Sequence, residues 1–504
     1  MDPKFIAATK ASFPAGGKTL TIGAPVLGGE CLPEPLVAVP LAMMNRHGLI
    51  AGATGTGKTR TLQMLAEQLS SAGVPVFLAD IKGDLSGLGV PGESSDRIAT
   101  RAKETGYPWQ GMGCPVEFLS LTGAKGAQLR ATVSSFGPLL LARVLGLNET
   151  QASVLSLVFK YCDDRKLPLL DFADLRAVLQ HLTGAGAADL KDYGGMAPAT
   201  VGVLLRDMVV LEQQGAQAFF GEPEFDLDDL LVVDPDGRGR LSVLELADVQ
   251  DRPALFSTFM MWMLARLYHE LPELGDVEKP KLVFFFDEAH LLFGGASKAF
   301  LDQVEQVVRL IRSKGVGVFF VTQNPRDVPP EVLGQLGHRV QHALRAFTPD
   351  DEKALKSAAR TFPKTTFYDI EATLTTLGIG EALVTVLSGN GVPTAPVVTR
   401  VVPPAARMGP LTDAEMSQRL AASAQVREYA QAVDRESARE RLSARMAPAA
   451  AAAGVPAQAA AGGVVALSAF EQILKSPVTR TVAGVVTRGL LGALLGPPPR
   501  RRRY

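Results

Sequence analysis

A glycine-rich loop, Gly52 to Thr59 with the sequence GATGTGKT, constrains the fold of this 504-residue chain more than any other segment. It follows a short apolar run, His47–Ala51, and precedes a helical pattern from Lys58 to Ser71. When a strand leads into a helix through such a loop, backbone N–H groups and the helix N-terminus point at negative charge. A second strand-like run, Val76–Ala79, follows at βαβ spacing. The pattern predicts a phosphate-binding loop in an α/β fold.

The loop carries the groups that hold a triphosphate and its metal ion. Lys58 would reach the β- and γ-phosphates as a compact cation, and the Thr59 hydroxyl would complete a Mg²⁺ shell. ATP and Mg²⁺ are therefore the expected ligands. A chance glycine-rich turn is the alternative, and the flanking strand and helix disfavour it. The predicted phosphate-binding residues are Gly52, Ala53, Thr54, Gly55, Thr56, Gly57, Lys58 and Thr59.

Two carboxylates follow a second apolar run, Leu282–Phe286. We predict that Asp287 supports Mg²⁺ and that Glu288 polarises a water for in-line attack on the γ-phosphate. A carboxylate pair at a strand end can instead cap the next helix. That alternative would be preferred without the upstream loop; with the loop, the catalytic interpretation is favoured.

A polar amide ends a third apolar run, Val318–Thr322. Gln323 in that position can sense the γ-phosphate and relay hydrolysis to moving parts. The alternative is a plain strand terminus.

Composition and periodicity divide the chain into segments. Further strands are expected at 241–246, 339–344 and 382–387, and their alternation with helices favours a mostly parallel sheet. Thr412 and Glu415 form a capping-box signature for a long charged helix to about Met446. The predicted division is 1–46, a short β-rich segment; 47–125 and 233–402, the α/β core; 126–232, a helical insertion; 403–446, a charged helix; 447–463, an Ala/Gly/Pro linker; and 464–504, an apolar helix with a basic tail.

Charge and cysteine content exclude some classes of protein. Lys plus Arg total 51 and Asp plus Glu total 52, so the net charge of −1 excludes binding to nucleic acid by bulk positive charge but not a local basic channel. A hydrophobic content of 47% excludes disorder throughout. Three scattered cysteines, no signal peptide and no long apolar run indicate a cytoplasmic location.

The motifs, in order, resemble those of the HerA-like ATPases, a bacterial family within the HerA/FtsK group of hexameric DNA-pumping motors. The segments that carry the resemblance, over roughly residues 15–400, are GATGTGKT, ADIKGD (79–84), LVFFFDEAH, VEQVVRLIRSKG and FFVTQNP. The resemblance implies a RecA-like P-loop NTPase core. The predicted C-terminal helical appendage is an addition that the resemblance does not cover. The resemblance also implies a homo-hexamer with ATP between neighbouring subunits.

In such a ring, an arginine of the neighbouring subunit would stabilise the transition state. The resemblance makes Arg309 and Arg312 candidates, as well as Arg339 and Arg345. For each, a surface arginine or a structural ion pair is the alternative.

The expected function is Mg²⁺-dependent ATP hydrolysis that drives translocation on, or unwinding of, DNA without sequence specificity. Two alternatives stay open: a ring ATPase that moves a protein, and a nucleotide-binding scaffold with low turnover. HerA motors dock a nuclease on an N-terminal β-barrel, but the segment before Gly52 is too short for a whole barrel, so no nuclease partner is expected.

Three other motifs are assigned less specific roles. DEAH at 287–290 is not taken as a superfamily-two helicase motif, because no second motor domain follows. Asp234 to Glu245 imitates a calcium loop, but Arg238 occupies a ligand position, which favours a turn into a strand. The apolar segment 488–496 before the arginine tail favours packing on the ring or solubilisation over membrane attachment.

Overall fold

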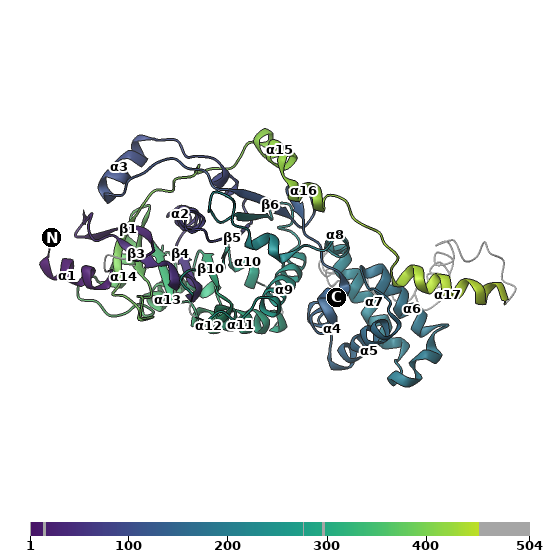
Figure 1. The fold of residues 1–504 in the computed structure, drawn as a ribbon. Helices are drawn as coiled ribbons and strands as arrows, with labels where there is room; N and C mark the ends of the chain where they lie inside the picture. Colours follow the sequence, from purple (N-terminus) through teal and green to yellow (C-terminus); the bar gives the residue numbers. More distant parts are fainter. Residues whose placement is uncertain (1, 14–16, 276, 295–297, 453–504) are drawn as a thin grey trace, which may run out of the picture. The chain divides into compact units, whose positions relative to one another are not determined.

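The computed structural model describes residues 2–13, 17–275, 277–294 and 298–452 (Figure 1). Residues 1–438 belong to one compact unit, and a second unit begins at Arg439. The predicted apolar helix and basic tail, 464–504, lie outside the described residues, as does most of the predicted linker.

Among the described residues, thirteen strands form one sheet in the order β2-β1-β13-β12-β11-β4-β10-β9-β5-β8-β6-β7, with β3 paired to β1. The predicted α/β fold with a mostly parallel sheet is confirmed. The strands are β1 Thr19–Leu27, β2 Glu30–Cys31, β3 Val37–Pro40, β4 Gly48–Ala51, β5 Val76–Asp80, β6 Val116–Ser120, β7 Ala127–Gln128, β8 Leu241–Glu245, β9 Leu282–Phe286, β10 Val316–Thr322, β11 His338–His342, β12 Glu381–Thr385 and β13 Val397–Val401.

All pairings from β11 to β7 through β4, β10, β9, β5, β8 and β6 are parallel. The strands β4, β5, β9 and β10 are buried at every position. Continuous apolar runs of this kind are expected where helices cover both faces of a parallel sheet. The carboxyl ends of these strands therefore share one edge of the sheet, and polar residues that follow the strands meet there.

The other end of the sheet is antiparallel. β12 pairs with β11, β13 with β12, and β1 with β13. The predicted β-rich segment 1–46 thus extends the core sheet. It also contains a helix, α1, which we did not predict.

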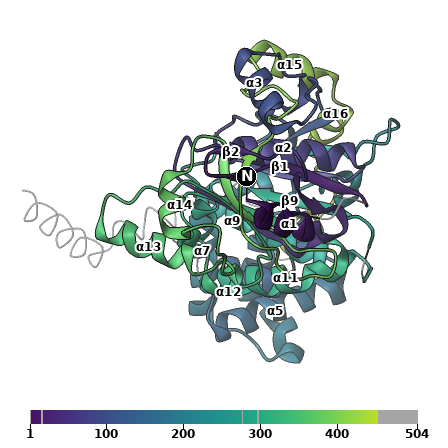
Figure 2. The same ribbon diagram turned by 90° about the vertical axis from the view of Figure 1, so that its left-hand side faces the viewer.

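Helices join the strands and form most of the segment between β7 and β8. Figure 2, turned from Figure 1, shows α13 and α14, which pack on each other. The α-helices are α1 Pro3–Ser12, α2 Lys58–Ser71, α3 Asp96–Thr105, α4 Val133–Val144, α5 Glu149–Arg165, α6 Phe172–Thr183, α7 Pro198–Gln213, α8 Ala216–Phe219, α9 Pro253–Glu270, α10 His290–Phe293, α11 Lys298–Ile311, α12 Pro330–Leu333, α13 Pro349–Ala359, α14 Ile370–Thr376, α15 Asp413–Ala422, α16 Ala424–Tyr429 and α17 Ala438–Ala452.

The helices α4 to α8 lie where the helical insertion was predicted, and α4 contacts the core helix α9. The Trp262 indole N–H donates to Ser135 Oγ at 3.4 Å across this contact. Within α4, Gly137 adopts φ 73° and Pro138 follows, so the helix is kinked.

The prediction of one continuous charged helix over 403–446 is wrong. The capping box of Thr412 and Glu415 begins α15 as predicted, but that helix ends at Ala422. Ser423 has extended backbone and its side chain accepts the Val426 N–H, so it starts the new helix α16. A serine hydroxyl competes for backbone groups in this way. The helix α17 runs through Ala452, so residues 447–452 are helical and not linker.

The calcium-like segment forms a turn that leads into β8, as predicted. Its acidic oxygens pair with arginines of the same segment, Asp234 with Arg240 and Asp236 with Arg238. In the part of the chain that the structure describes, no group of three or more His, Cys, Asp or Glu side chains is arranged to hold a metal ion.

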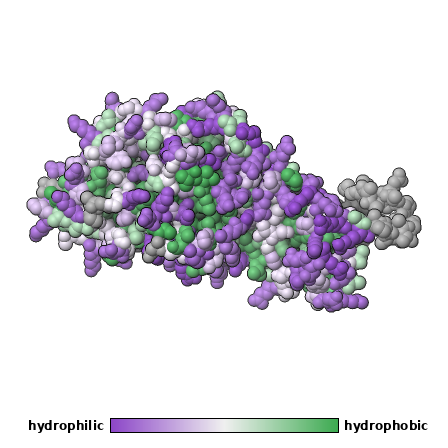
Figure 3. Space-filling model, in the orientation of Figure 1, coloured by the Kyte–Doolittle hydropathy of each residue, from purple (hydrophilic) through white to green (hydrophobic). Residues whose placement is uncertain are grey.

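The surface drawn in Figure 3 is mostly hydrophilic, with a hydrophobic area near its middle. No single described helix combines the length and the hydropathy of a membrane span; one bent pair, Ala187–Tyr193 with Pro198–Gln213, does so only when both parts are counted together.

Candidate active site

The glycine-rich loop joins the carboxyl end of β4 to the first turn of α2. Gly55 and Gly57 have φ of 78° and 116°, conformations that glycine adopts without steric cost. Gly57 is also the N-cap of α2, and no side chain caps this helix. The N–H groups of the first turn are therefore left for a ligand, as an anion site requires.

Neighbouring strand ends hold the loop in place. The Gly52 N–H donates to Thr322 O at the end of β10 (3.2 Å), and the Ala53 N–H donates to Ala343 O (2.8 Å). On the other side, the Gly380 N–H donates to Thr56 O at 2.9 Å. These bonds fix the loop before any ligand arrives, which reduces the entropy lost on binding.

Lys58 folds back over the loop. Its Nζ donates to Ala53 O at 3.2 Å, and the residue is 7% exposed. Burial lowers the pKa of Lys58, while the negative charges of Glu288 and Asp287 act against that shift. The ammonium group therefore lies within electrostatic reach of both the predicted metal ligand Asp287 and the predicted catalytic carboxylate Glu288. Thr59 follows in the first turn of α2, partly exposed.

Asp287 directly follows β9, which is separated from β4 only by β10. Its Oδ1 accepts the Glu288 N–H at 2.9 Å, whereas its Oδ2 is buried and has no hydrogen-bond partner. Burial first, and then the charge of Glu288, raise the pKa of Asp287 to about 7. A buried carboxylate oxygen without a partner is costly unless a cation meets it, so the donor set fits a Mg²⁺ ion.

Glu288 lies at the centre of the site in a strained conformation, with φ 49°. Lys82 donates to its Oε1. Gln323 Nε2 lies 3.5 Å from its Oε2, and His290 Nδ1 lies 3.2 Å from the same oxygen. Burial acts to raise the pKa of Glu288, but the hydrogen bond and charge of Lys82, with smaller effects of Gln323 and His290, lower it, so the carboxylate stays ionised.

Two of these contacts were not predicted. Lys82 belongs to the motif ADIKGD and His290 to the motif DEAH, but neither residue had a predicted role. The signal for Lys82 was available, because it follows β5, whose carboxyl end lies on the same edge as those of β9 and β10. Gln323, by contrast, was predicted beside the γ-phosphate, and the structure brings its amide to Glu288.

The candidate arginines lie in different places. Arg309 is near the end of α11, 3.9 Å from Glu305, and Arg312 is in the turn that leads into the amino end of β10. The loop lies at the carboxyl end of the sheet, so neither arginine faces the loop of its own chain. Arg339 is partly buried on β11. Arg345 lines a cavity of about 350 Å³ together with Ala53 and Thr54 of its own loop.

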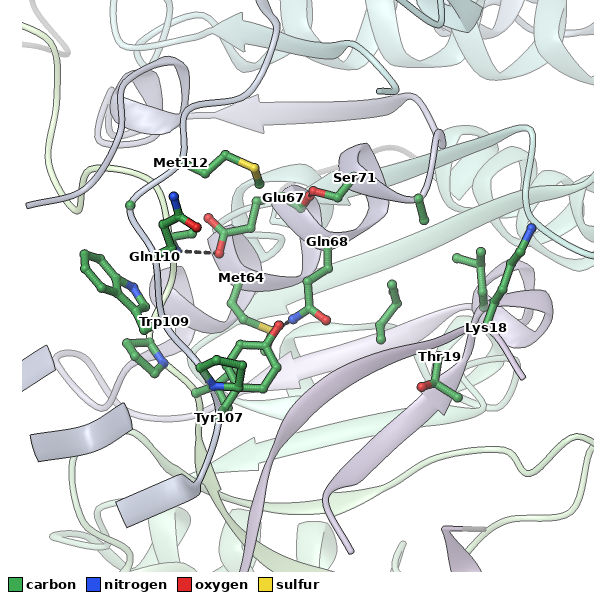
Figure 4. Close-up of a pocket in the computed structure, with 18 of the residues that line it drawn as sticks. Lys18, Thr19, Met64, Glu67, Gln68, Ser71, Tyr107, Trp109, Gln110 and Met112 are labelled. Carbon is green, nitrogen blue, oxygen red and sulfur yellow. Dashed lines mark hydrogen bonds between the residues drawn. The ribbon is translucent and has the colours of Figure 1, made fainter. Parts of the chain in front are cut away.

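A separate cavity of about 850 Å³ lies beside the C-terminal half of α2 (Figure 4). Tyr107 and Trp109 line it from the loop after α3. The Glu67 carboxylate accepts the N–H groups of Ala405 and Ala406 at 2.6 and 2.9 Å. Burial raises the pKa of Glu67 to about 7. Both carboxylate oxygens are satisfied by the backbone, so this glutamate holds the chain near Ala405 against α2.

The chain is similar to a described protein family and to a curated protein. The sequence model of a family described as "Helicase HerA-like C-terminal" matches residues 29–503. A curated relative, the probable helicase MJECL08 of Methanocaldococcus jannaschii, is 28% identical over 155 residues. That match covers 29% of this chain and spans only 28% of the length of the relative.

A solved structure shows the same fold. The plasmid coupling protein TrwB in complex with ADP and Mg²⁺ is 17% identical, with a TM-score of 0.50, and the match covers 79% of this chain and 99% of that one. VirB4 of Thermoanaerobacter pseudethanolicus is 16% identical, with a TM-score of 0.45 and coverage of 77% and 98%.

Proposed function

This chain belongs to the helicase HerA-like C-terminal family of P-loop ATPases, and we propose that it hydrolyses ATP with Mg²⁺ in order to move along, or unwind, DNA. One observation carries the proposal. The glycine-rich loop and the carboxylates Asp287 and Glu288 lie on the same edge of one parallel sheet, close enough for Lys58 to be influenced by both charges.

Each residue of the site has a task in hydrolysis. The loop backbone and Lys58 bind the phosphates, and Thr59 and Asp287 would hold Mg²⁺, which neutralises charge that develops on the phosphate oxygens. Glu288 orients a water and accepts its proton while the water oxygen bonds to the γ-phosphorus. The bond from that phosphorus to the bridging oxygen breaks in the same step, and ADP and phosphate leave. Gln323, within reach of the same carboxylate, positions the water or the phosphate.

We propose that the active form is a homo-hexameric ring with shared sites. Arg309 and Arg312 do not face the loop of their own chain, so a neighbouring subunit is where either guanidinium can act on the phosphates. A positive charge placed there would stabilise the transition state. Arg345 is placed beside its own loop and fits a role in cis better.

DNA is the proposed track because the family is described as helicase-like and the curated relative is named a probable helicase. The net charge of −1 requires that phosphate contacts be made by a local group of basic side chains, as a pore provides. The absence of a nuclease partner and the cytoplasmic location remain predictions.

The test is steady-state ATPase activity of the full chain with and without DNA, over a range of salt concentrations, alongside particle mass with and without ATP. Glu288→Gln should lower turnover by about 10²-fold or more, since such groups contribute about 10²–10⁴-fold. Glu371→Gln, on the exposed face of α14, is the matched control and should leave turnover unchanged.

The outcomes separate the alternatives. Stimulation by DNA that falls steeply with salt supports a DNA motor. Hydrolysis that is indifferent to DNA points to a ring that moves a protein. Negligible turnover in the wild type, unchanged by Glu288→Gln, would indicate a scaffold and overturn the proposal.

A further inference from the structure

Lys82 is held at the site by a rigid turn. The carboxylate of Asp80, the last residue of β5, accepts the Gly83 N–H through Oδ1 and the Leu85 N–H through Oδ2, both at 2.8 Å. Asp80 is fully buried, so this turn is anchored in the core. The chain at residue 82 therefore has a fixed position at the carboxyl edge of the sheet, between the ends of β5 and β9.

The Lys82 side chain uses that position to pair with Glu288. The two partners differ in exposure, because the Lys82 side chain is 46% exposed and that of Glu288 only 4%. The ammonium therefore covers the buried carboxylate from the solvent side. Burial acts to lower the pKa of Lys82, but its hydrogen bond to Glu288 and the charges of Glu288 and Asp287 raise it.

Four charges thus share a small space. The pKa of Lys58 responds to Lys82, Asp287 and Glu288, and these three residues also influence one another. In this group two lysines face two carboxylates. A bound triphosphate adds several negative charges to this group, and it offers an ammonium ion a stronger partner than one carboxylate.

The pair also has a chemical consequence for Glu288. Lys82 occupies Oε1, and a carboxylate that is neutralised by an ammonium ion is a weaker proton acceptor. Glu288 therefore cannot act at full strength as a base while Lys82 remains on it.

We propose that Lys82 is a second triphosphate-binding lysine, paired with Glu288 when no nucleotide is bound and transferred to the γ-phosphate oxygens when ATP binds, which frees Glu288 to polarise the water. The inference rests on the proposed function, and it makes Lys82 the residue through which the site binds ATP more tightly than ADP. Lys82 thus affects the reaction in two ways, by blocking Glu288 until ATP binds and by binding phosphate afterwards. The half-exposed, flexible lysine stem allows the movement that the exchange requires.

The test is a double-mutant cycle on nucleotide binding, measured by calorimetry with Mg²⁺ and either ADP or a non-hydrolysable ATP analogue. Lys82→Met should weaken binding of the analogue by about 10-fold or more, the scale of a lost hydrogen bond between charged groups, and change ADP binding by less than about 2-fold. Glu288→Gln should tighten binding of the analogue, because Lys82 no longer has to leave a carboxylate. In the double variant that gain should disappear.

Two further variants separate binding from folding. Lys82→Arg keeps the charge and should restore part of the preference for the analogue, and Lys353→Met, at an exposed lysine of α13, should change nothing. In turnover assays, Lys82→Met should raise KM for ATP more than it lowers kcat, since it removes binding of the ground state.

Equal weakening of ADP and the analogue, or effects of Lys82→Met and Glu288→Gln that simply add, would overturn the inference while leaving the proposed function intact. If the wild-type chain binds neither nucleotide, the proposed function is wrong and the inference falls with it.

Discussion

Asp80 and Glu245 lie directly opposite each other on the parallel strands β5 and β8, and both side chains are buried. Burial raises the pKa of Asp80 to about 6. Burial, and then the charge of Asp80, raise the pKa of Glu245 to about 8, and one oxygen of Glu245 has no hydrogen-bond partner. Asp84 and Asp248 add to the repulsion, and Lys125 opposes it. The burial and mutual repulsion of these two carboxyl groups destabilise the folded state, near the edge of the sheet that carries the candidate active site.

The pair predicts a stability that falls as the pH rises. Glu245 binds its proton more tightly in the folded state than in the unfolded state, where its pKa is near 4.5, so stability is lost between pH 4.5 and about 8. Each pH unit in that window costs on the order of 1.4 kcal/mol. Glu245→Gln removes the titrating group and should raise the melting temperature by several degrees at pH 8 but little at pH 5. The same shift at both pH values would contradict the assignment, and Glu371→Gln serves as the control.

The two loop glycines Gly52 and Gly55 should respond differently to alanine. A Cβ at Gly52 would lie 2.5 Å from the Cβ of His342, and φ is 154°. At Gly55, φ is 78°, but a Cβ would meet nothing within 4 Å. Gly55→Ala should cost about 1 kcal/mol, whereas Gly52→Ala must displace β11 or the loop and should lower both the melting temperature and nucleotide affinity much further. Similar melting temperatures for the two variants would show that the loop can shift away from His342 at little cost.

Removing the loop lysine should abolish tight binding without harming the fold. Lys58 is 7% exposed, and burial lowers its pKa, so its charge is costly to keep in the protein without a ligand. Lys58→Ala should weaken binding of a non-hydrolysable ATP analogue by about 10- to 100-fold and leave the melting temperature nearly unchanged. Unaltered affinity, measured beside Lys356→Ala as the control, would disprove the role of the lysine.

Mixed rings should reveal which arginine acts between subunits. Arg312→Ala and Glu288→Gln should each be inactive, but a mixture should regain activity, because some interfaces then join an intact Glu288 to an intact Arg312. Arg345 lines the cavity beside its own loop, so Arg345→Ala should not regain activity when mixed with Glu288→Gln. ATPase activity of the mixtures is the measurement. A mixture of Lys58→Ala and Glu288→Gln is the control, and it should stay inactive, as both changes damage the site within one chain. Failure of the Arg312→Ala mixture to regain activity would remove Arg312 from the shared site, and recovery in the Arg345→Ala mixture would contradict a role of Arg345 in cis.

The strands of the core could be predicted closely, because they are buried on both faces. The run 282–286 matches β9, the run 318–322 lies within β10, and the other predicted strands lie within one or two residues of those observed. The strand at 382–387 was predicted, but its antiparallel pairing as β12 was not, nor was the extension of this sheet by β13 and β1. Pairing partners far apart in the chain leave no local signal, since any half-buried strand satisfies the same pattern.

The helix break at Ser423 could not be predicted from the local sequence either. Charged and apolar residues continue in helical period past it, so the pattern favoured a single helix. In the structure the Ser423 hydroxyl donates to Glu117 on β6 at 2.7 Å and also caps α16. The helix therefore breaks where Ser423 contacts a residue about three hundred positions earlier in the chain. Hydrophobic periodicity carries no information about such a contact.

The sequence by itself determined the chemistry of this protein: the loop, the lysine, the two carboxylates and the glutamine all follow from local order, since a strand followed by polar residues places them at one end of that strand. Only the tertiary structure decided which of these groups touch. The order of the strands brings Lys82, which follows β5, and Gln323, which follows β10, to the same carboxylate of Glu288. The parallel direction of β4 and β10 places Arg312 at the end of the sheet opposite the loop of its own chain. Strand order is set by packing of the whole sheet, so no short stretch of residues contains it.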